Sequence, residues 1–222
     1  EKILGLSNIF GSLLVLGIPM GMYSLFLEQE RDKSERLLHN IMPKAIADRL
    51  KKTKETISID NPEISVLFAD IVNFTVISEK LSADKVVGFL NEMFSEFDEL
   101  AEKYNVEKIK TIGDSYMVVA GLTSNTNDHA TILFKFGQEL IKISSKYKDH
   151  VGEPILLKIG LNSGPAVSGV IGKSKFSFDI WGDTINTAAR LESYGIPNKI
   201  HISDNTFKLI NKKIKHDKMS IK

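Results

Sequence analysis

The sequence predicts an α+β protein in which a membrane-spanning helix and a charged connecting helix precede a domain of mixed helices and strands. Three observations lead to this prediction. Residues 3–27 contain no charged side chain, residues 28–55 are charged and free of glycine, and from residue 56 onward short apolar runs alternate with amphipathic stretches. We therefore expect three parts: a transmembrane helix over 1–27, a signalling helix over 28–55 and a globular domain over 56–222.

The composition excludes several classes of protein. Of the 222 residues 42% are hydrophobic, and 29 Lys and Arg balance 28 Asp and Glu to a formal net charge of +1. A chain without a basic excess is not expected to bind nucleic acid, and this hydrophobic content argues against disorder. The sequence has 0 Cys, so disulfides, zinc ribbons and thiol nucleophiles are excluded, and any metal must be bound by oxygen or imidazole.

The first part is an apolar segment from Ile3 to Leu27, long enough as a helix to cross a hydrocarbon core of roughly 30 Å. A buried core helix or a signal peptide would usually be shorter, and no small-residue cleavage site follows. Pro19 is tolerated in such a helix. Basic residues mixed with acidic ones follow the segment (Arg31, Lys33 and Arg36), whereas Lys2 precedes it, and this slight bias predicts that the following domain is cytoplasmic. Because the first residue is Glu1 and not Met, we expect a piece of a longer protein, with any sensor preceding it.

The second part has the periodicity of a helix. Apolar residues recur at helical spacing at positions Leu37, Leu38, Ile41, Ile46 and Leu50. Pro43 lacks the donor that a continuing helix needs, so the pattern predicts two helical pieces that meet at Met42–Pro43. Periodicity alone supports a signalling helix and a solvated spacer equally.

The third part shows short apolar strands and two amphipathic helices. Gly113–Asp114 is a strong hairpin signal, and Ser82 is placed to cap a helix. Ser163-Gly164-Pro165 predicts a break between two strands. The expected strands are Ile64–Phe68, Glu107–Ile112, Ser115–Ala120, Ile155–Asn162, Val167–Ile171 and Lys199–Ile202, and the expected helices are Ser82–Tyr104, Asp128–Tyr147 and Thr184–Ser193. The order βαββαβ predicts a ferredoxin-like arrangement, with helices on one face of an antiparallel sheet.

This predicted arrangement makes two aspartates candidate metal ligands. Asp70 follows the first buried strand and Asp114 lies at the hairpin tip. In a βαββ order these elements are neighbours, so both carboxylates can converge on one edge of the sheet. Paired carboxylates suit hard cations such as Mg²⁺ or Mn²⁺. From their spacing alone, however, a structural role for both residues is the more common interpretation.

Four motifs read together resemble one family. They are FADIVNFT (68–75), EKIKTIGDSYMVVAG (107–121), KIGLNSGPAVSGVIG (158–172) and FDIWGDTINTAARLES (178–193). They occur in the order found in class III nucleotidyl cyclases, and the resemblance extends from about Leu37 to Lys222. LLHNIMPKAIADRL (37–50) is similar to the transducer helix that precedes such domains. The resemblance implies a head-to-tail homodimer with active sites built from both chains.

The resemblance also implies roles for individual residues. Asp70, Asp114 and the backbone carbonyl of Ile71 match the ligands of two Mg²⁺ or Mn²⁺ ions in each site. Asn186 and Arg190 are four residues apart, which places them on one face of a helix. They match the transition-state pair, in which Asn186 would hold the ribose and Arg190 the charge that develops on the α-phosphate. A solvated polar face is the alternative for the two residues taken alone.

Lys110 and Asp179 match the two positions that select the base in this family. An adenine edge offers an acceptor at N1 and a donor at the 6-amino group, which a lysine donor and an aspartate acceptor complement. The guanylyl members carry an acidic residue in place of Lys110, so this sequence resembles an adenylyl cyclase that converts ATP to cyclic AMP and pyrophosphate. Two alternatives stay open: a guanylyl cyclase, and a catalytically silent cyclase-like signalling module.

Two positions depart from the family pattern. The turn of Asn73, Phe74 and Thr75 is expected to approach the triphosphate with its backbone donors, and Asn73 stands where the family often has Gly. Asn tolerates unusual backbone angles, so we expect the turn to form. The phosphate-binding lysine of the family has its counterpart in Lys222, at the end of the sequence.

Overall fold

The computed structural model describes residues 22–39, 41–52, 57–122, 128–172 and 175–210. The chain divides into two compact units, residues 1–53 and residues 54–222. Most of the predicted transmembrane segment, residues 1–21, lies outside the described residues. Within the described ranges no helix combines the length and the apolar character that a membrane crossing requires.

The N-terminal unit contains two helical pieces. Residues 22–39 are helical, and a second helix, α2, spans Lys44–Lys52. Pro43 lies between them, and its carbonyl oxygen accepts hydrogen bonds from the amides of Ile46 at 2.9 Å and Ala47 at 3.0 Å. The carbonyl of Pro43 thus begins α2, whereas its nitrogen has no hydrogen to continue the preceding helix. The prediction of two pieces meeting at Met42–Pro43 is confirmed.

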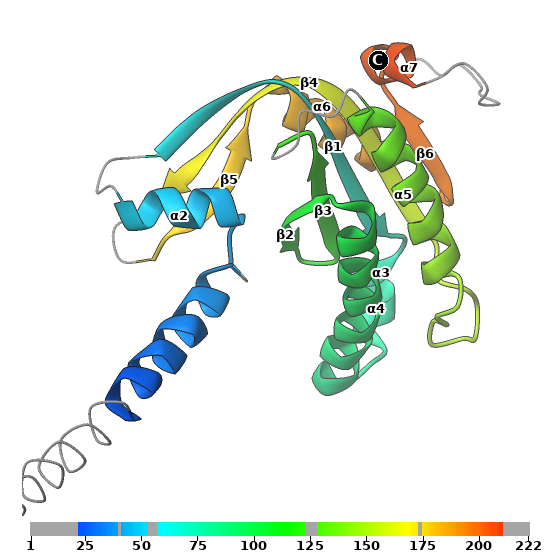
Figure 1. Ribbon diagram of the computed structural model, residues 1–222. Helices are drawn as coiled ribbons and strands as arrows, with labels where there is room; N and C mark the ends of the chain where they lie inside the picture. Colours follow the sequence, from blue (N-terminus) through cyan, green and yellow to red (C-terminus); the bar gives the residue numbers. More distant parts are fainter. Residues whose placement is uncertain (1–21, 40, 53–56, 123–127, 173–174, 211–222) are drawn as a thin grey trace, which may run out of the picture. The chain divides into compact units, whose positions relative to one another are not determined.

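The larger unit is a six-stranded sheet with helices packed against it (Figure 1). The strand order is β2-β3-β1-β4-β5, and β6 also pairs with β4. β6 runs parallel to β4, and the other pairings are antiparallel. The strands are β1 (Ile57–Ile71), β2 (Glu107–Ile112), β3 (Ser115–Ala120), β4 (Leu157–Ile171), β5 (Ser177–Trp181) and β6 (Lys199–Ile202), and the helices are α3 (Phe74–Glu79), α4 (Ala83–Tyr104), α5 (His129–Ser144), α6 (Asp183–Ser193) and α7 (Asp204–Leu209).

The predicted order βαββαβ is confirmed in β1, α4, β2, β3, α5 and β4. The predicted break in the fourth strand is wrong, because β4 runs without interruption from Leu157 to Ile171. Its partner β1 is bulged: Asn61 pairs with Ala166 and Ile64 with Gly164, so two residues of β1 lie opposite Pro165 alone. A bulge is one of the few places where a strand tolerates proline. The elements β5, α3 and α7 were not predicted.

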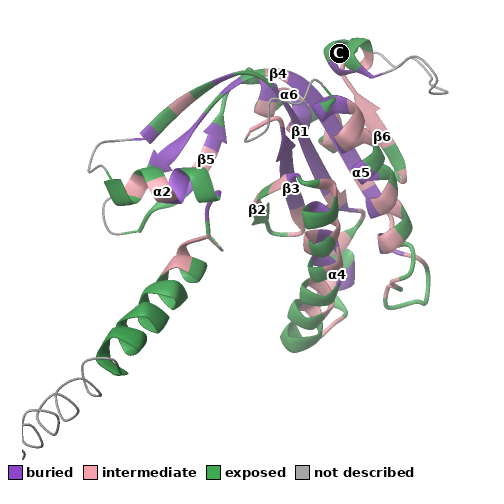
Figure 2. Ribbon diagram, in the orientation of Figure 1, coloured by how far each residue is buried: buried purple, intermediate pink, exposed green. Residues whose placement is uncertain are grey.

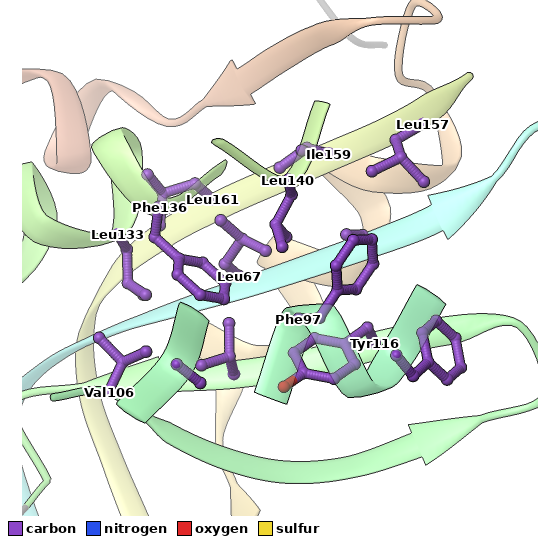
Figure 3. Packing of buried hydrophobic residues seen from close by; sticks show 14 of the residues in the cluster. Leu67, Phe97, Val106, Tyr116, Leu133, Phe136, Leu140, Leu157, Ile159 and Leu161 are labelled. Carbon is purple, nitrogen blue, oxygen red and sulfur yellow. The ribbon is translucent and has the colours of Figure 1, made fainter. Parts of the chain in front are cut away.

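The main core lies between the sheet and the helices α4 and α5. Figure 3 shows Leu67 of β1 and Leu161 of β4 packed with Leu133, Phe136 and Leu140 of α5. Burial is concentrated along β1 and β4, as Figure 2 shows. Since side chains alternate along a strand, the odd positions 157, 159 and 161 of β4 face this core and the even positions face the opposite side.

Helix α6 packs on that opposite side, directly against the backbone of β4. A Cβ atom at Gly160 would lie 2.2 Å from the amide nitrogen of Glu192 and 2.3 Å from the carbonyl oxygen of Ala188. At Gly164 it would lie 2.8 Å from Oγ1 of Thr184. Two glycines on one face of β4 therefore let α6 approach more closely than any side chain would permit. The predicted one-sided arrangement holds for α4 and α5, and α6 is added on the other face.

This close approach predicts that Gly160→Ala destabilises the domain. The new methyl group would overlap backbone atoms, which cannot rotate away, and we expect a loss of about 1–3 kcal/mol or more. Gly88→Ala is the matched control, because Gly88 lies in α4 with no atom within 4 Å of an added Cβ. The control should gain about 0.5–1 kcal/mol from helix propensity. Thermal unfolding measures both variants, and shifts of the same sign would contradict the packing described.

Candidate active site

Asp70 and Asp114 are brought together by the pairing of β1 with the β2–β3 hairpin. Ala69 of β1 lies opposite Tyr116 of β3, which places the end of β1 beside the hairpin turn. Gly113 opens this turn with φ of 64°, a left-handed conformation that glycine adopts without strain. The expectation that the first strand and the hairpin are neighbours is confirmed.

The two carboxylates are partly buried and repel each other. Burial raises the pKa of Asp70 to about 6, the charge of Asp114 adds to this rise, and Lys158 opposes it. Burial also raises the pKa of Asp114, against the effect of the backbone amides of Asp114 and Ile71. Negative charge at this edge of the sheet is therefore only partly compensated by the protein, and a bound cation would relieve it.

A third carboxylate, Glu192 of α6, was missed by sequence reasoning. Burial raises its pKa to about 7, Asp70 raises it further, and Lys158 lowers it. Lys158 is the cross-strand partner of Asp70 in the β1–β4 pairing. The buried residues Thr184 and Ala188 precede Glu192 at steps of four, and this spacing is the signal that could have placed Glu192 on the sheet side of the helix.

The donor atoms at this edge suit a hard divalent cation. In the described part of the chain no cluster of three or more His, Cys, Asp or Glu residues forms a complete metal site. Asp70 and Asp114 would supply carboxylate oxygens and Ile71 its carbonyl oxygen, leaving other positions for water and substrate phosphate. Mg²⁺ is typically held in this way, by one or two carboxylates together with phosphates.

Lys110 and Asp179 form an ion pair across the concave side of the sheet. Nζ of Lys110 donates to Oδ2 of Asp179 at 2.5 Å, and Oδ1 of Asp179 accepts from the amide of Ile180 at 2.9 Å. Their strands, β2 and β5, are at opposite ends of the strand order, yet the two residues meet because the long β1–β4 ribbon arches between them (Figure 1). The bulge opposite Pro165 lies in this ribbon, and bulges bend strands and increase their twist.

Asn186 and Arg190 lie on the exposed side of α6. Neither side chain has a hydrogen bond or an ion pair with any other described residue, so both are available to a ligand. The opposite side of the helix is buried through Thr184 and Ala188. Arg190 precedes Glu192 by two residues, a rotation of about 200° around the helix, so it points away from the carboxylates of its own chain.

The turn before α3 has the backbone conformation expected of it. Asn73 adopts φ of 58° and ψ of 28°, the left-handed region that asparagine tolerates better than most residues. The first bond within the helix runs from the amide of Ile77 to the carbonyl of Asn73, which leaves the amides of Phe74 and Thr75 without a partner in the helix. Lys222 lies outside the described residues.

Comparison with known proteins decides the family. The model of the adenylate and guanylate cyclase catalytic domain matches residues 58–222, nearly the whole of the larger unit. The chain belongs to this family. The cyclase domain contains the two aspartates, the Lys110–Asp179 pair and the exposed face of α6. The resemblance to class III nucleotidyl cyclases is thereby confirmed.

Relatives of this cyclase domain include both adenylate and guanylate cyclases. The chain is 42% identical over 182 residues to an adenylate cyclase of Mycobacterium tuberculosis, covering 82% of this chain and 41% of the relative. It is 41% identical over 185 residues to guanylate cyclase 2D of Rattus norvegicus, covering 81% of this chain and 16% of the relative. The chain thus spans less than half the length of these relatives.

Solved cyclase structures share the fold. The catalytic core of a rhodopsin-guanylyl cyclase with converted specificity, in complex with ATPαS, is 39% identical with a TM-score of 0.69 and covers 77% of this chain and 93% of that one. The adenylyl cyclase CyaB of P. aeruginosa is 29% identical with a TM-score of 0.63, covering 70% of this chain and 82% of that one. The α+β fold of the cyclase domain is therefore shown, whereas similarity to both types does not separate ATP from GTP as substrate.

The raised pKa of Asp70 predicts that its charge opposes folding when no divalent cation is present. The folded-state pKa of about 6 lies above the ordinary 3.8. The loss of folding stability caused by ionised Asp70 is therefore largest above pH 6, decreases between pH 6 and 4 and disappears below pH 4. Asp70→Asn should therefore raise the melting temperature at pH 7.5 in EDTA, with a smaller gain at pH 4.5. The exposed Asp60 provides the control Asp60→Asn. A lower melting temperature for Asp70→Asn at pH 7.5 would refute the stated cause.

Proposed function

We propose that this cyclase domain is an adenylyl cyclase that converts ATP to 3′,5′-cyclic AMP and pyrophosphate. We choose ATP over GTP because Lys110 and Asp179 form an ion pair in the site. The pair presents a lysine donor beside an aspartate acceptor, and the Lys110 ammonium keeps two hydrogens beyond the one given to Asp179. The Lys110 ammonium can donate to adenine N1, while Asp179 accepts from the 6-amino group.

Guanine would meet the opposite pattern. Its N1 is a donor and its O6 an acceptor, so the same two side chains would leave polar groups unpaired in a partly enclosed site. Similarity to known cyclases does not make this distinction, since relatives of both kinds are about equally similar. The substrate preference therefore rests on the two side chains alone.

The remaining site residues suit an intramolecular attack of the ribose 3′-hydroxyl on the α-phosphate. Two divalent ions held by Asp70, Asp114 and the carbonyl of Ile71 would lower the pKa of that hydroxyl and neutralise the departing pyrophosphate. The guanidinium of Arg190 has no partner among the described residues, and its planar fork suits the charge that develops on the α-phosphate. Asn186, one helical turn earlier, is placed to hold the ribose.

The orientation of α6 supports a site composed from two chains. Arg190 and Asn186 point away from Asp70 of their own chain, so a nucleotide bound at that carboxylate would need these groups from a second copy. Exposed apolar side chains surround Asp179 on the same face of β4 and β5, where they could be covered by such a copy: Val167, Ile171 and Trp181. The guanylyl cyclase domain of the RhoGC fusion protein from Blastocladiella emersonii is described as a non-canonical dimer in one structure and as monomeric in another. For this chain we propose a head-to-tail homodimer.

The N-terminal unit would anchor this homodimer to a membrane. The uncharged run from Ile3 to Leu27 supports a transmembrane helix, and the described helix over 22–39 includes the last residues of that run. We place the catalytic domain on the cytoplasmic side because Arg31, Lys33 and Arg36 follow the apolar run, a slight bias of basic residues toward that side. The helical pieces before the catalytic domain would then transmit changes from the membrane to the relative placement of the two copies.

Assaying the full chain with ATP and with GTP tests the proposed activity. With Mn²⁺ present we expect cyclic AMP from ATP and much less cyclic GMP from GTP, measured by chromatography of the products. Asp70→Asn should lower the rate with ATP by about 100-fold or more, because the loss of a metal ligand costs several kcal/mol of transition-state stabilisation. Mn²⁺ should also raise the melting temperature of the unaltered chain more than that of Asp70→Asn.

Lys110→Glu is the matched variant for base selection, since it reverses the hydrogen-bond pattern and leaves the metal ligands intact. We expect it to lose activity with ATP far more than it loses stability. Equal use of ATP and GTP by the unaltered chain would contradict the assignment to ATP. Undiminished preference for ATP in Lys110→Glu would show that the base is selected elsewhere.

The composite site predicts recovery of activity when two inactive variants are mixed. Asp70→Ala and Arg190→Ala damage different halves of the site, so each mixed dimer keeps one intact site. Random pairing should restore about a quarter of the original activity, because half of the dimers are mixed and each holds one working site of two.

Mixing Asp70→Ala with Asp114→Ala is the control for this recovery. Both substitutions fall in the same half, so no site in the mixed dimer is intact and no activity should return. Differently tagged chains purified in two steps isolate the mixed dimers, in which the Asp70→Ala and Arg190→Ala pair should show about half of the original activity, since one site of two is intact. Inactive mixed dimers of Asp70→Ala with Arg190→Ala would refute the composite site.

A further inference from the structure

One buried and one partly buried hydrogen bond tie the first turn of α6 to β4. Nδ2 of Asn162 donates to the carbonyl oxygen of Thr184 at 3.0 Å, and Oγ1 of Thr184 donates to the carbonyl oxygen of Pro165 at 2.7 Å. The exposed fraction is 5% for both Asn162 and Thr184. Buried polar groups such as the side chains of Asn162 and Thr184 are costly to leave without a hydrogen-bond partner, so these bonds restrain the atoms that they join.

Asn162 is itself held from its other side. Oγ of Ser203 donates to Oδ1 of Asn162 at 2.6 Å and accepts from the amide of Thr206 at 3.1 Å, which caps α7. Thr206 in turn bonds Oγ of Ser163 at 3.0 Å. The amide group of Asn162 therefore cannot rotate without breaking a bond at each end, and it forms a rigid support for α6.

Among the described residues, no other side chain forms a hydrogen bond with the first turn of α6. Its N-cap residue is Gly182, which has no side chain to bond the first amides of the helix. Gly164 lies against Thr184, and Gly160 lies against Ala188 and Glu192. The backbone of these glycines limits the distance between β4 and α6, but a glycine has no side chain to form a polar contact with the helix. The direction of the first turn thus depends on the bonds of Thr184 and Asn162.

We propose that Thr184 and Asn162 are positioning residues for catalysis, which hold α6 so that Asn186 and Arg190 meet the nucleotide in the correct register. This inference rests on the proposed cyclase activity. Thr184 lies two residues before Asn186 and on the opposite side of the helix, so a tilt of the first turn displaces both site residues. Displacements of about 1 Å can lower a rate by 10²-fold even when they arise away from the reacting atoms.

Two substitutions at Thr184 separate the hydroxyl from the shape of the side chain. Thr184→Val keeps the branched shape and removes the bond to Pro165, whereas Thr184→Ser keeps the hydroxyl and removes a methyl group. In the full chain with ATP and Mn²⁺, we expect Thr184→Val to lower kcat by about 10- to 100-fold, with KM changed less than about 3-fold. Thr184→Ser should keep kcat within about 3-fold of the unaltered chain.

Ser144→Ala controls for the general effect of losing a buried hydroxyl. Ser144 is fully buried in α5, and its hydroxyl bonds the carbonyl of Ile141 within the same helix, away from α6. We expect this variant to lower the melting temperature without lowering kcat. A kcat for Thr184→Val equal to that of Ser144→Ala, or an equal loss of kcat in Thr184→Ser and Thr184→Val, would overturn the proposal.

Hydrogen exchange of the same variants provides a readout that does not need activity. Thr184→Val should speed exchange at the amides of Asn186 and Thr187, and Thr184→Ser should not; unchanged exchange in Thr184→Val would overturn the anchoring. An unaltered chain that makes no cyclic nucleotide would instead refute the proposed function, while the exchange rates would still decide whether Thr184 fixes the helix.

Discussion

The pairing of β1 with β4 holds every part of the candidate site. Each strand has 15 residues, and the ladder between them runs along nearly their full length. Asp70 lies at the end of β1, α6 rests on two glycines of β4, and β5 and β3 extend the sheet from opposite ends of the ribbon. The arch of this ribbon brings Lys110 to Asp179. A change in its register would therefore separate the two aspartates, the Lys110–Asp179 pair and the helix of Asn186 from one another.

Elements whose signals are local could be predicted from the sequence. The bounds of the β2–β3 hairpin follow from Gly113–Asp114, and the neighbouring positions of Asp70 and Asp114 follow from the βαββ order. The continuity of β4 could not be predicted, because Ser163-Gly164-Pro165 indicates a turn unless the bulge of the partner strand is known. The spacing of Thr184, Ala188 and Glu192 places them on one face of α6, but only the contact between α6 and the distant strand β4 shows that this face meets the sheet.

The charges at the end of β1 oppose folding and favour ligand binding for the same reason. Asp70, Asp114 and Glu192 share a partly buried region in which Lys158 is the cation that lowers the pKa of Asp70 and of Glu192. Burial makes each carboxylate costly to ionise, and the same burial strengthens its attraction for a cation. The site thus stores unfavourable electrostatic energy in the protein alone, and this energy is released when positive charge enters.

In the proposed site, the ion pair of Lys110 and Asp179 would also compete with the base for the same two side chains. The exposed fractions of the two side chains are 39% and 19%, and a pair at such a position contributes little stability, of the order of 1 kcal/mol or less. A base that matches both groups would break the ion pair at this small cost and would form two new hydrogen bonds in its place. A mismatched base would break the ion pair without forming equivalent hydrogen bonds. Only a complementary base would therefore compensate for the lost interaction between Lys110 and Asp179. If the pair binds the base as proposed, contact between the two side chains would keep them ordered when no nucleotide is bound, at an energy low enough for a matching base to separate them.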